Sequence, residues 1–127
     1  MTDSRTPAVV LITDDLTITT HVQALSEQRG WSFLVVRPET LSAQSDTLSD
    51  ARMVVVDLGC SAVTPQVLRS VIDAAGRGPA TVAFGPHVHG ERLQAARELG
   101  FRHVLPRGRF LSTAAALFEQ VAGAREP

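Results

Sequence analysis

The chain alternates short apolar runs with longer segments in which apolar residues recur every three or four positions. Two runs stand out, at residues 8–13 and 53–56, because they are rich in β-branched residues and too short for helices. Runs of this kind are typical of strands that are buried on both faces. Acids follow them, Asp14 and Asp15 after the first and Asp57 after the second. Further strands are predicted at residues 31–36, 80–84 and 101–105.

Helical periodicity separates the predicted strands. Gly30 and Gly100 each follow a periodic segment, at the position where a glycine commonly ends a helix. Pro65 lies where a proline favours the first helical turn. The predicted helices are residues 17–29, a short weak one within 39–50, one that starts after a cap at Ser61 or Thr64, 91–99 and 110–121.

Five strands that alternate with five helices, a (βα)5 pattern, predict an α/β domain whose helices cover both faces of a parallel sheet. For five strands we expect the flavodoxin-like order 2-1-3-4-5, with ligands at the carboxyl ends of strands 1 and 3. We expect residues 1–127 to form a single domain. Within it, residues 1–7 are expected to be a flexible N-terminus and residues 123–127 a tail or the start of a linker.

The composition narrows the class of protein. The 127 residues are 44% hydrophobic and carry a formal net charge of −1, which favours neither nucleic acid nor a membrane surface as a partner. All 12 basic residues are arginine, so the chain has no lysine. Cys60 is the only cysteine and excludes an internal disulfide. Since no apolar segment resembles a signal peptide or a membrane span, we expect a cytoplasmic protein.

The predicted strand order places Asp14, Asp15 and Asp57 side by side at one edge of the sheet. Two carboxylates about 4 Å apart repel one another by about 4 kcal/mol at an effective dielectric of about 20. Such a cluster needs either a proton held on one carboxylate or a cation. Mg²⁺ suits it, because this ion prefers a few carboxylates and keeps several of its waters.

The acid pair after strand 1, Asp57 after strand 3 and Leu105-Pro106 after strand 5 resemble the receiver domains of two-component response regulators. The (βα)5 pattern extends the resemblance over nearly the whole chain. The resemblance implies that Asp14 and Asp15 hold Mg²⁺ and that Asp57 is the phospho-acceptor of a phosphorelay. It also implies that the Gly59 carbonyl is a further metal ligand. A cis bond between Leu105 and Pro106 is expected on the same ground.

The chain departs from the family where receivers transmit the phosphorylation signal. Receivers carry a lysine just before the proline after strand 5, and this chain has Leu105 there. They carry a threonine or serine at the end of strand 4, and this chain has Gly85. Their aromatic switch residue in strand 5 corresponds to Arg102. We therefore interpret the chain as a pseudo-receiver, a non-enzymatic signal-transduction module that binds proteins rather than switching by normal phosphorylation.

In such domains the face made by helix 4, strand 5 and helix 5 commonly docks a partner or a second copy. The corresponding residues here lie within 91–120. We expect a protein partner or a homodimer through this face, with a histidine kinase as one candidate partner. We expect no cofactor other than Mg²⁺, and neither nucleic acid nor a membrane as a ligand of this domain.

Two other functions stay open. A working phospho-receiver would use Asp57 with Mg²⁺, and Arg107 or Arg109 would replace the missing lysine as the partner of the phosphoryl anion. A small α/β ligand-binding domain or enzyme is the second alternative. The sequence contains neither a glycine-rich phosphate loop nor a nucleophile elbow, which argues against an enzyme.

Three other side chains could carry chemistry. His87 and His89 form a His-x-His pair, but Zn²⁺ takes four ligands and no other histidine or cysteine is near in sequence. We interpret them as ordinary loop residues. Cys60 is either a redox-sensitive thiol beside the acids or an inert small core residue.

Overall fold

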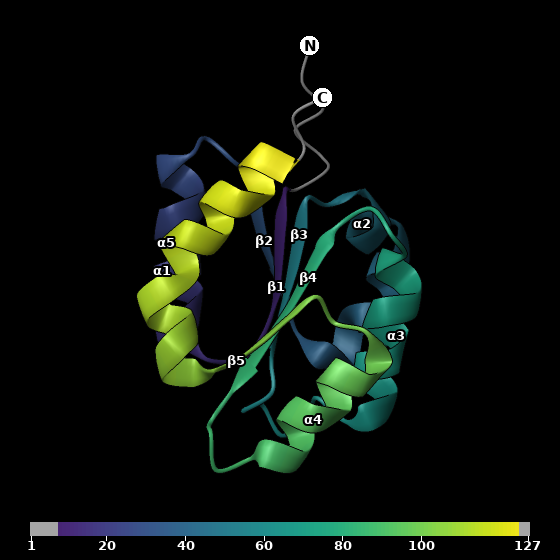
Figure 1. Cartoon of the computed structure of the whole chain (residues 1–127). Helices are drawn as coiled ribbons and strands as arrows, with labels where there is room; N and C mark the ends of the chain where they lie inside the picture. The colour runs from purple at the N-terminus through teal and green to yellow at the C-terminus, as the bar shows by residue number, and fades with distance from the viewer. Residues whose placement is uncertain (1–7, 125–127) are drawn as a thin grey trace.

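The structure, a computed structural model, describes residues 8–124, except the side chains of residues 42–45 and 123–124. Strands and helices alternate along the chain as the sequence predicts (Figure 1). The elements are β1 (Val9–Ile12), α1 (Leu16–Gln28), β2 (Phe33–Val36), the 3₁₀ helix η1 (Pro38–Gln44), α2 (Ser45–Asp50), β3 (Met53–Asp57), α3 (Pro65–Ala75), β4 (Ala80–Gly85), α4 (Gly90–Leu99), β5 (His103–Pro106) and α5 (Arg107–Ala124).

The five strands form one parallel sheet in the order β2-β1-β3-β4-β5, which confirms the predicted topology. β1 lies between β2 and β3, with Ile12 in register with both Val36 and Val56. Every residue of β1, β3 and β4 is buried, and this explains why these strands are apolar apart from Asp57 and Thr81. The carboxyl ends of β1 and β3 are therefore neighbours.

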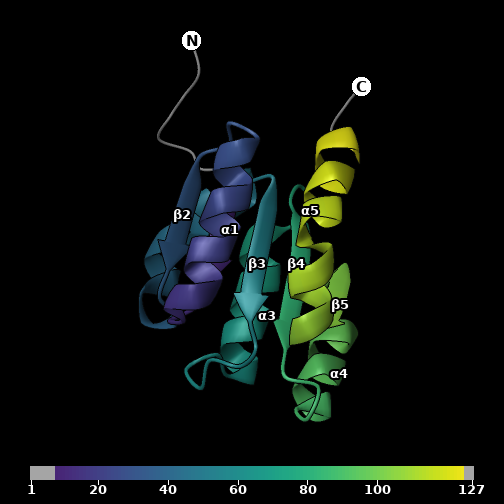
Figure 2. The same cartoon turned by 90° about the vertical axis from the view of Figure 1, so that its left-hand side faces the viewer.

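Helices cover both faces of the sheet. Figure 1 shows α1 and α5 on one side and α2, α3 and α4 on the other, and the view in Figure 2 places α1 and α5 in front of the strands. On the first face the rings of Phe84 and Phe110 stack with their centroids 4.3 Å apart. Alternate residues of β1 point to opposite faces, so each face has its own apolar core.

Local signals predict most helix ends. Thr64 caps α3, because its hydroxyl oxygen accepts a hydrogen bond from the amide of Val67 at 3.2 Å, and Pro65 follows it. Gly100 ends α4 with a φ of 103°, a conformation that favours glycine. None of the helices within residues 8–124 is long and apolar enough to cross a bilayer.

The last helix differs from its prediction at both ends. α5 begins at Arg107, before the predicted start at residue 110, and continues to Ala124. Residues 123 and 124 of the predicted tail are therefore helical. The rest of that tail, residues 125–127, and the predicted flexible N-terminus, residues 1–7, lie outside the described residues.

The predicted cis bond between Leu105 and Pro106 is wrong, since no peptide bond within residues 8–124 is cis. Pro106 is the last residue of β5 and is in register with Gly85 at the end of β4. A trans bond keeps the chain extended up to this pair, and α5 begins at the next residue. The chain therefore departs from the receiver pattern at one more position.

Candidate functional site

The carboxylate of Asp57 is buried and held by donors of the protein itself. Asp57 ends β3 and is 3% exposed. Its Oδ2 accepts a hydrogen bond from the hydroxyl of Thr13 at 2.7 Å, and its Oδ1 accepts one from the amide of Gly59 at 2.8 Å. Sequence reasoning missed Thr13. The signal was present, because the first apolar run ends on a hydroxyl residue directly before the acids.

Asp15 serves as the N-cap of α1. Its Oδ1 accepts hydrogen bonds from the amides of Thr17 at 2.8 Å and Ile18 at 3.1 Å, and its Oδ2 lies 3.4 Å from Nη2 of Arg107. The Ile18 amide, together with the charge of Arg107, holds the pKa of Asp15 below its ordinary value even though partial burial acts in the opposite direction. Both carboxylate oxygens of Asp15 thus have partners other than Asp57.

The remaining acid, Asp14, is exposed and lies beside the buried thiol of Cys60. Cys60 is 3% exposed, and burial raises the pKa of its thiol, with the neighbouring Asp14 carboxylate acting in the same direction. A thiol of raised pKa stays protonated at neutral pH and is a poor nucleophile. These surroundings favour an inert core residue over a redox-sensitive thiol.

Two of the predicted Mg²⁺ ligands, Asp15 and Asp57, have hydrogen-bond donors of the protein as partners. Within residues 8–124, no group of three or more acidic, histidine or cysteine side chains is placed to hold one ion. The oxygens of Asp15 and Asp57 accept hydrogen bonds from the protein, and a carboxylate oxygen that accepts one such bond keeps a further lone pair. Metal binding by Asp14, Asp15, Asp57 and the Gly59 carbonyl stays a prediction.

The two histidines between β4 and α4 belong to no metal-binding group in the described part of the chain. His87 and His89 are both exposed. His89 occupies the N-cap position of α4, but its side chain makes no capping hydrogen bond. Their interpretation as ordinary loop residues stays a prediction.

Gly85, at the position of the receiver switch hydroxyl, is closely covered. A Cβ atom added to Gly85 would lie 2.8 Å from the Cβ of Leu58, nearer than two carbon atoms can approach without a shift. Leu58 is 1% exposed, and its amide donates to the carbonyl of Phe84 at 2.7 Å, which fixes its position. Leu58 therefore fills the space that a larger residue at position 85 would need.

The residues near the missing lysine divide between the core and the surface. Leu105 is partly buried and packs against the core under α1 and α5. Arg107, the first residue of α5, reaches the acids through its ion pair with Asp15. Arg109 is exposed, and its guanidinium has no carboxylate partner among residues 8–124. Of the two predicted anion partners, only Arg107 is thus brought to the acidic edge.

No protein-family model matches the chain, and neither does any curated protein. Solved structures do match. A pilus assembly-related protein of Burkholderia pseudomallei is 13% identical, with a TM-score of 0.68 over 100% of this chain and 97% of that one. A CheY-like protein (TadZ) of Pseudomonas aeruginosa is 22% identical, with a TM-score of 0.64 over 89% of this chain and 97% of that one. A response regulator in red light signalling of R. palustris is 14% identical, with a TM-score of 0.57 over 87% of this chain and 91% of that one.

The chain has the CheY-like receiver fold. Identities of 13–22% establish the fold and leave the chemistry to be argued from the residues. In this receiver-like domain the acids occupy the expected edge of the sheet, while protein donors and Leu58 occupy the space around them.

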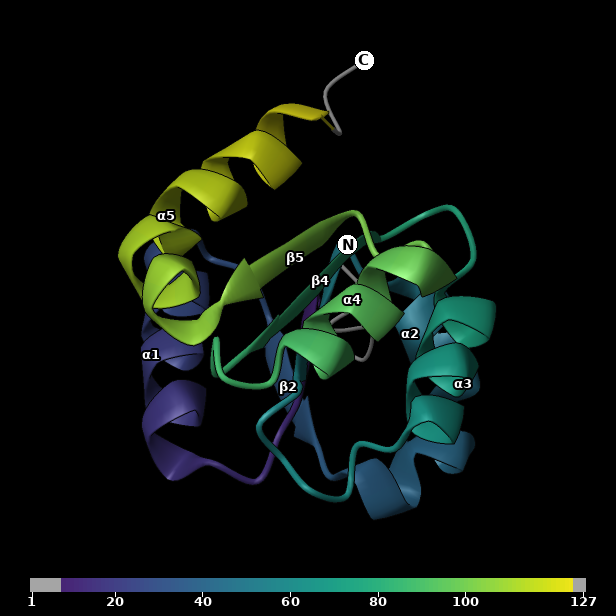
Figure 3. The ribbon, with the colours of Figure 1, turned by 60° about the horizontal axis from the view of Figure 1, so that its bottom comes forward.

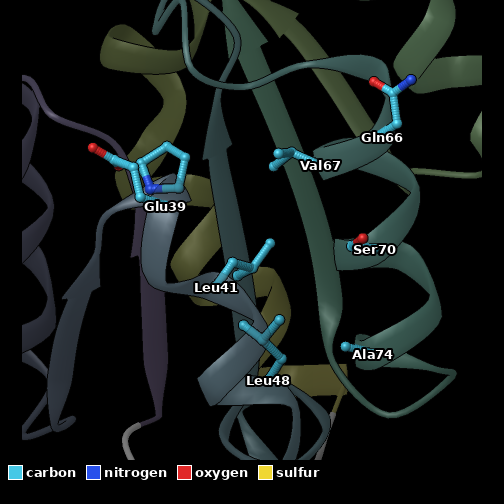
Figure 4. Close-up of a pocket in the computed structure, with 8 residues that line it drawn as sticks. Glu39, Leu41, Leu48, Gln66, Val67, Ser70 and Ala74 are labelled. Atoms are coloured by element: carbon cyan, nitrogen blue, oxygen red, sulfur yellow. The ribbon is translucent and has the colours of Figure 1, made fainter.

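A separate hollow of about 210 Å³ lies between η1, α2 and α3 of the receiver-like domain (Figure 4). The acids at the sheet edge are not among its lining residues, which are Pro38, Glu39, Leu41, Leu48, Gln66, Val67, Ser70 and Ala74.

We expect Gly85→Ala to lower the free energy of unfolding by about 1–3 kcal/mol, because the new methyl group meets the Cβ of Leu58. In a Leu58→Gly background that Cβ is absent, and the same substitution should cost less by at least about 0.5 kcal/mol. Urea unfolding followed by the fluorescence of Trp31, which stacks on Phe118, measures both values. Equal costs in the two backgrounds would contradict the steric explanation.

The lowered pKa of Asp15 predicts a pH-dependent contribution to stability. A depressed folded-state pKa stabilises the fold above the ordinary value of 3.8, and the stabilisation is lost as the pH falls through the lower folded value. Asp15→Asn keeps a capping oxygen but removes the charge that faces Arg107. We expect the free energy of unfolding of Asp15→Asn to be lower than that of the wild type by about 0.2–1 kcal/mol at neutral pH. In urea unfolding the difference from wild type should shrink as the pH falls below 3.8 and disappear once it is below the lower folded pKa of Asp15.

The matched control is Asp73→Asn, which removes a carboxylate from the exposed surface of α3. The free energy of unfolding of this variant should change with pH as that of the wild type does. If Asp15→Asn has the same lower free energy of unfolding in acid as at neutral pH, the charge of Asp15 contributes nothing and the amide caps α1 poorly.

Proposed function

We propose that this receiver-like domain acts in signal transduction as a pseudo-receiver, a non-enzymatic module that binds proteins and is not switched by normal phosphorylation. The observation that carries the proposal is the surroundings of Asp57, whose buried carboxylate oxygens accept hydrogen bonds from Thr13 and Gly59. Leu58 fills the space beside Gly85, where a switching hydroxyl would have to stand.

Energetic considerations support the same function. A phosphoryl group on Asp57 would bond to one of its two carboxylate oxygens and disturb the donor there, and a hydrogen bond to a charged group is worth about 1.5–3 kcal/mol. The lysine that would compensate is absent, and Arg107 is already paired with Asp15. A modification that favours neither of two conformations shifts no equilibrium between them.

The structural neighbours support a role in regulation or assembly. One is described as related to pilus assembly, one as CheY-like, and one as a response regulator in red light signalling. We propose by analogy that this domain works in the cytoplasm through a protein partner or a second copy, with a histidine kinase as one candidate. The analogy concerns the class of function and does not identify the partner.

The proposed docking face consists of α4, β5 and α5. β5 is an edge strand that pairs only with β4, and Figure 3 shows it between α4 and α5. Partial burial, and secondarily the charge of Arg102, lowers the pKa of His103 in this strand, so its imidazole is neutral at neutral pH.

The charge on this face is mixed. The guanidinium groups of Arg102 and Arg109 have no carboxylate partner among the described residues, while acids stand nearby on both helices. Mixed charge with free arginines suits a protein surface that carries acids, whereas nucleic acid would favour a uniformly positive field. The exposed charged residues of the face are Glu91, Arg97, Glu98, Arg102, Arg109 and Glu119.

We expect no stable phosphorylation of Asp57. The protein is incubated with acetyl phosphate and Mg²⁺, and its intact mass is measured beside Asp57→Asn and a phospho-accepting receiver that serves as the positive control. The positive control should gain one phosphoryl group, and this protein should gain none. A stable gain that Asp57→Asn abolishes would refute the pseudo-receiver and favour the working phospho-receiver.

Charge reversal should disrupt docking. In the full-length native protein we expect Arg102→Glu combined with Arg109→Glu to weaken partner capture or self-association by about tenfold or more, because like charges then meet across the interface. Quantitative pull-down and analytical ultracentrifugation measure the two cases. The control is Arg69→Glu combined with Arg77→Glu, two exposed residues outside α4, β5 and α5. An equal loss of partner capture or self-association in both double variants would contradict the proposed docking face.

A further inference from the structure

A single arginine fastens the first turn of α4 to the loop between β3 and α3. Nη1 of Arg92 donates to the carbonyl oxygens of Leu58 and Cys60, the latter at 3.3 Å, and Nη2 donates to the carbonyl oxygen of Val63 at 2.9 Å. Within the described residues no carboxylate pairs with this guanidinium. The positive charge of Arg92 is therefore directed at the backbone of one loop.

The same loop is held from two other elements. The amide of Leu58 donates to the carbonyl of Phe84 in β4, and Leu58 packs closely over Gly85. On the side of β3, the amide of Gly59 donates to the carboxylate of Asp57. Residues 58–64 are thus tied to β3, β4 and α4 together.

Arginine suits this position for a physical reason. Its guanidinium is planar and presents several donors in a fixed fork, so one side chain can hold three carbonyl groups at once. Bonds from a charged donor are also stronger than neutral ones, and Arg92 is partly buried, which reduces competition from water. A lysine could supply the charge but not this geometry.

We propose that Arg92 is a positioning residue that joins residues 58–64 and the first turn of α4 into one rigid unit. A displacement of α4 relative to the acidic edge would have to break the bonds from Arg92, so the helix is held in one position. The inference rests on the proposed function only where it treats α4 as part of the docking face. That face is then preformed rather than exposed by a switch.

Amide hydrogen exchange on the full chain tests this inference. We compare wild type with Arg92→Gln and with the matched control Arg97→Gln, since Arg97 lies on the same helix and its side chain donates, within residues 8–124, only to the side chain of Gln94. In Arg92→Gln we expect exchange in residues 58–64 and the first turn of α4 to accelerate by about tenfold or more, with α1 and α5 unchanged. Arg97→Gln should exchange as wild type does.

Two results would overturn the inference. One is exchange in Arg92→Gln that stays within about twofold of Arg97→Gln throughout the loop. The other is an equal acceleration of exchange in α1 and α5, which would mean that Arg92 contributes to global stability and is not a positioning residue for residues 58–64 and α4. If Arg92→Gln does not fold, Arg92→Lys serves instead, and it should accelerate exchange in the same segments because it keeps the charge and loses the fork.

This measurement uses neither phosphate nor a partner protein. Failure of the Arg92 inference can therefore be distinguished from failure of the proposed function. Phosphorylation of Asp57 together with slow exchange in residues 58–64 would refute the pseudo-receiver alone. Fast exchange in residues 58–64 of the wild-type protein would refute the Arg92 inference alone.

Discussion

The acidic edge depends on the parallel pairing of β1 with β3. This pairing places the residue after β1 beside the last residue of β3, and the hydroxyl of Thr13 donates to the carboxylate of Asp57 at 2.7 Å. Because the bond is buried, it is protected from competing water and holds the carboxylate in one orientation. The pairing itself follows from two strands that are buried throughout and apolar except for Asp57, so the position of the acids is a consequence of the core.

Around that edge, the carboxylates accept hydrogen bonds from donors of the protein itself. Arg107 pairs with Asp15, which also caps α1, and Arg92 binds the backbone of the loop that follows Asp57. Both contacts use the planar guanidinium group, whose donors have a fixed geometry. All 12 basic residues of this chain are arginine. The carboxylates of Asp15 and Asp57 are thus hydrogen-bonded within the fold, and these bonds are the physical basis for proposing a binding module.

The close contact of Leu58 with Gly85 restricts motion at the end of β4. A receiver that switches needs space for a side chain to move at the end of β4, and here that space is packed. Most of the core on either face of the sheet is made by residues away from this edge, so the fold can persist while the site changes. This independence of fold and site is why the likeness to solved receivers carries the architecture and not the chemistry.

The sequence by itself determined the α/β class, the strand order and several helix ends. Buried parallel strands leave uninterrupted apolar runs, and local signals such as Thr64 and Gly100 act within a few residues of the ends they fix. Only the tertiary structure decided the partner of each charged group. Asp15 turned toward Arg107 and Arg92 toward the 58–64 loop, because such contacts depend on side-chain directions between elements distant in sequence. The cis bond expected before Pro106 was wrong, since it rested on the receiver resemblance and not on a signal in the residues themselves.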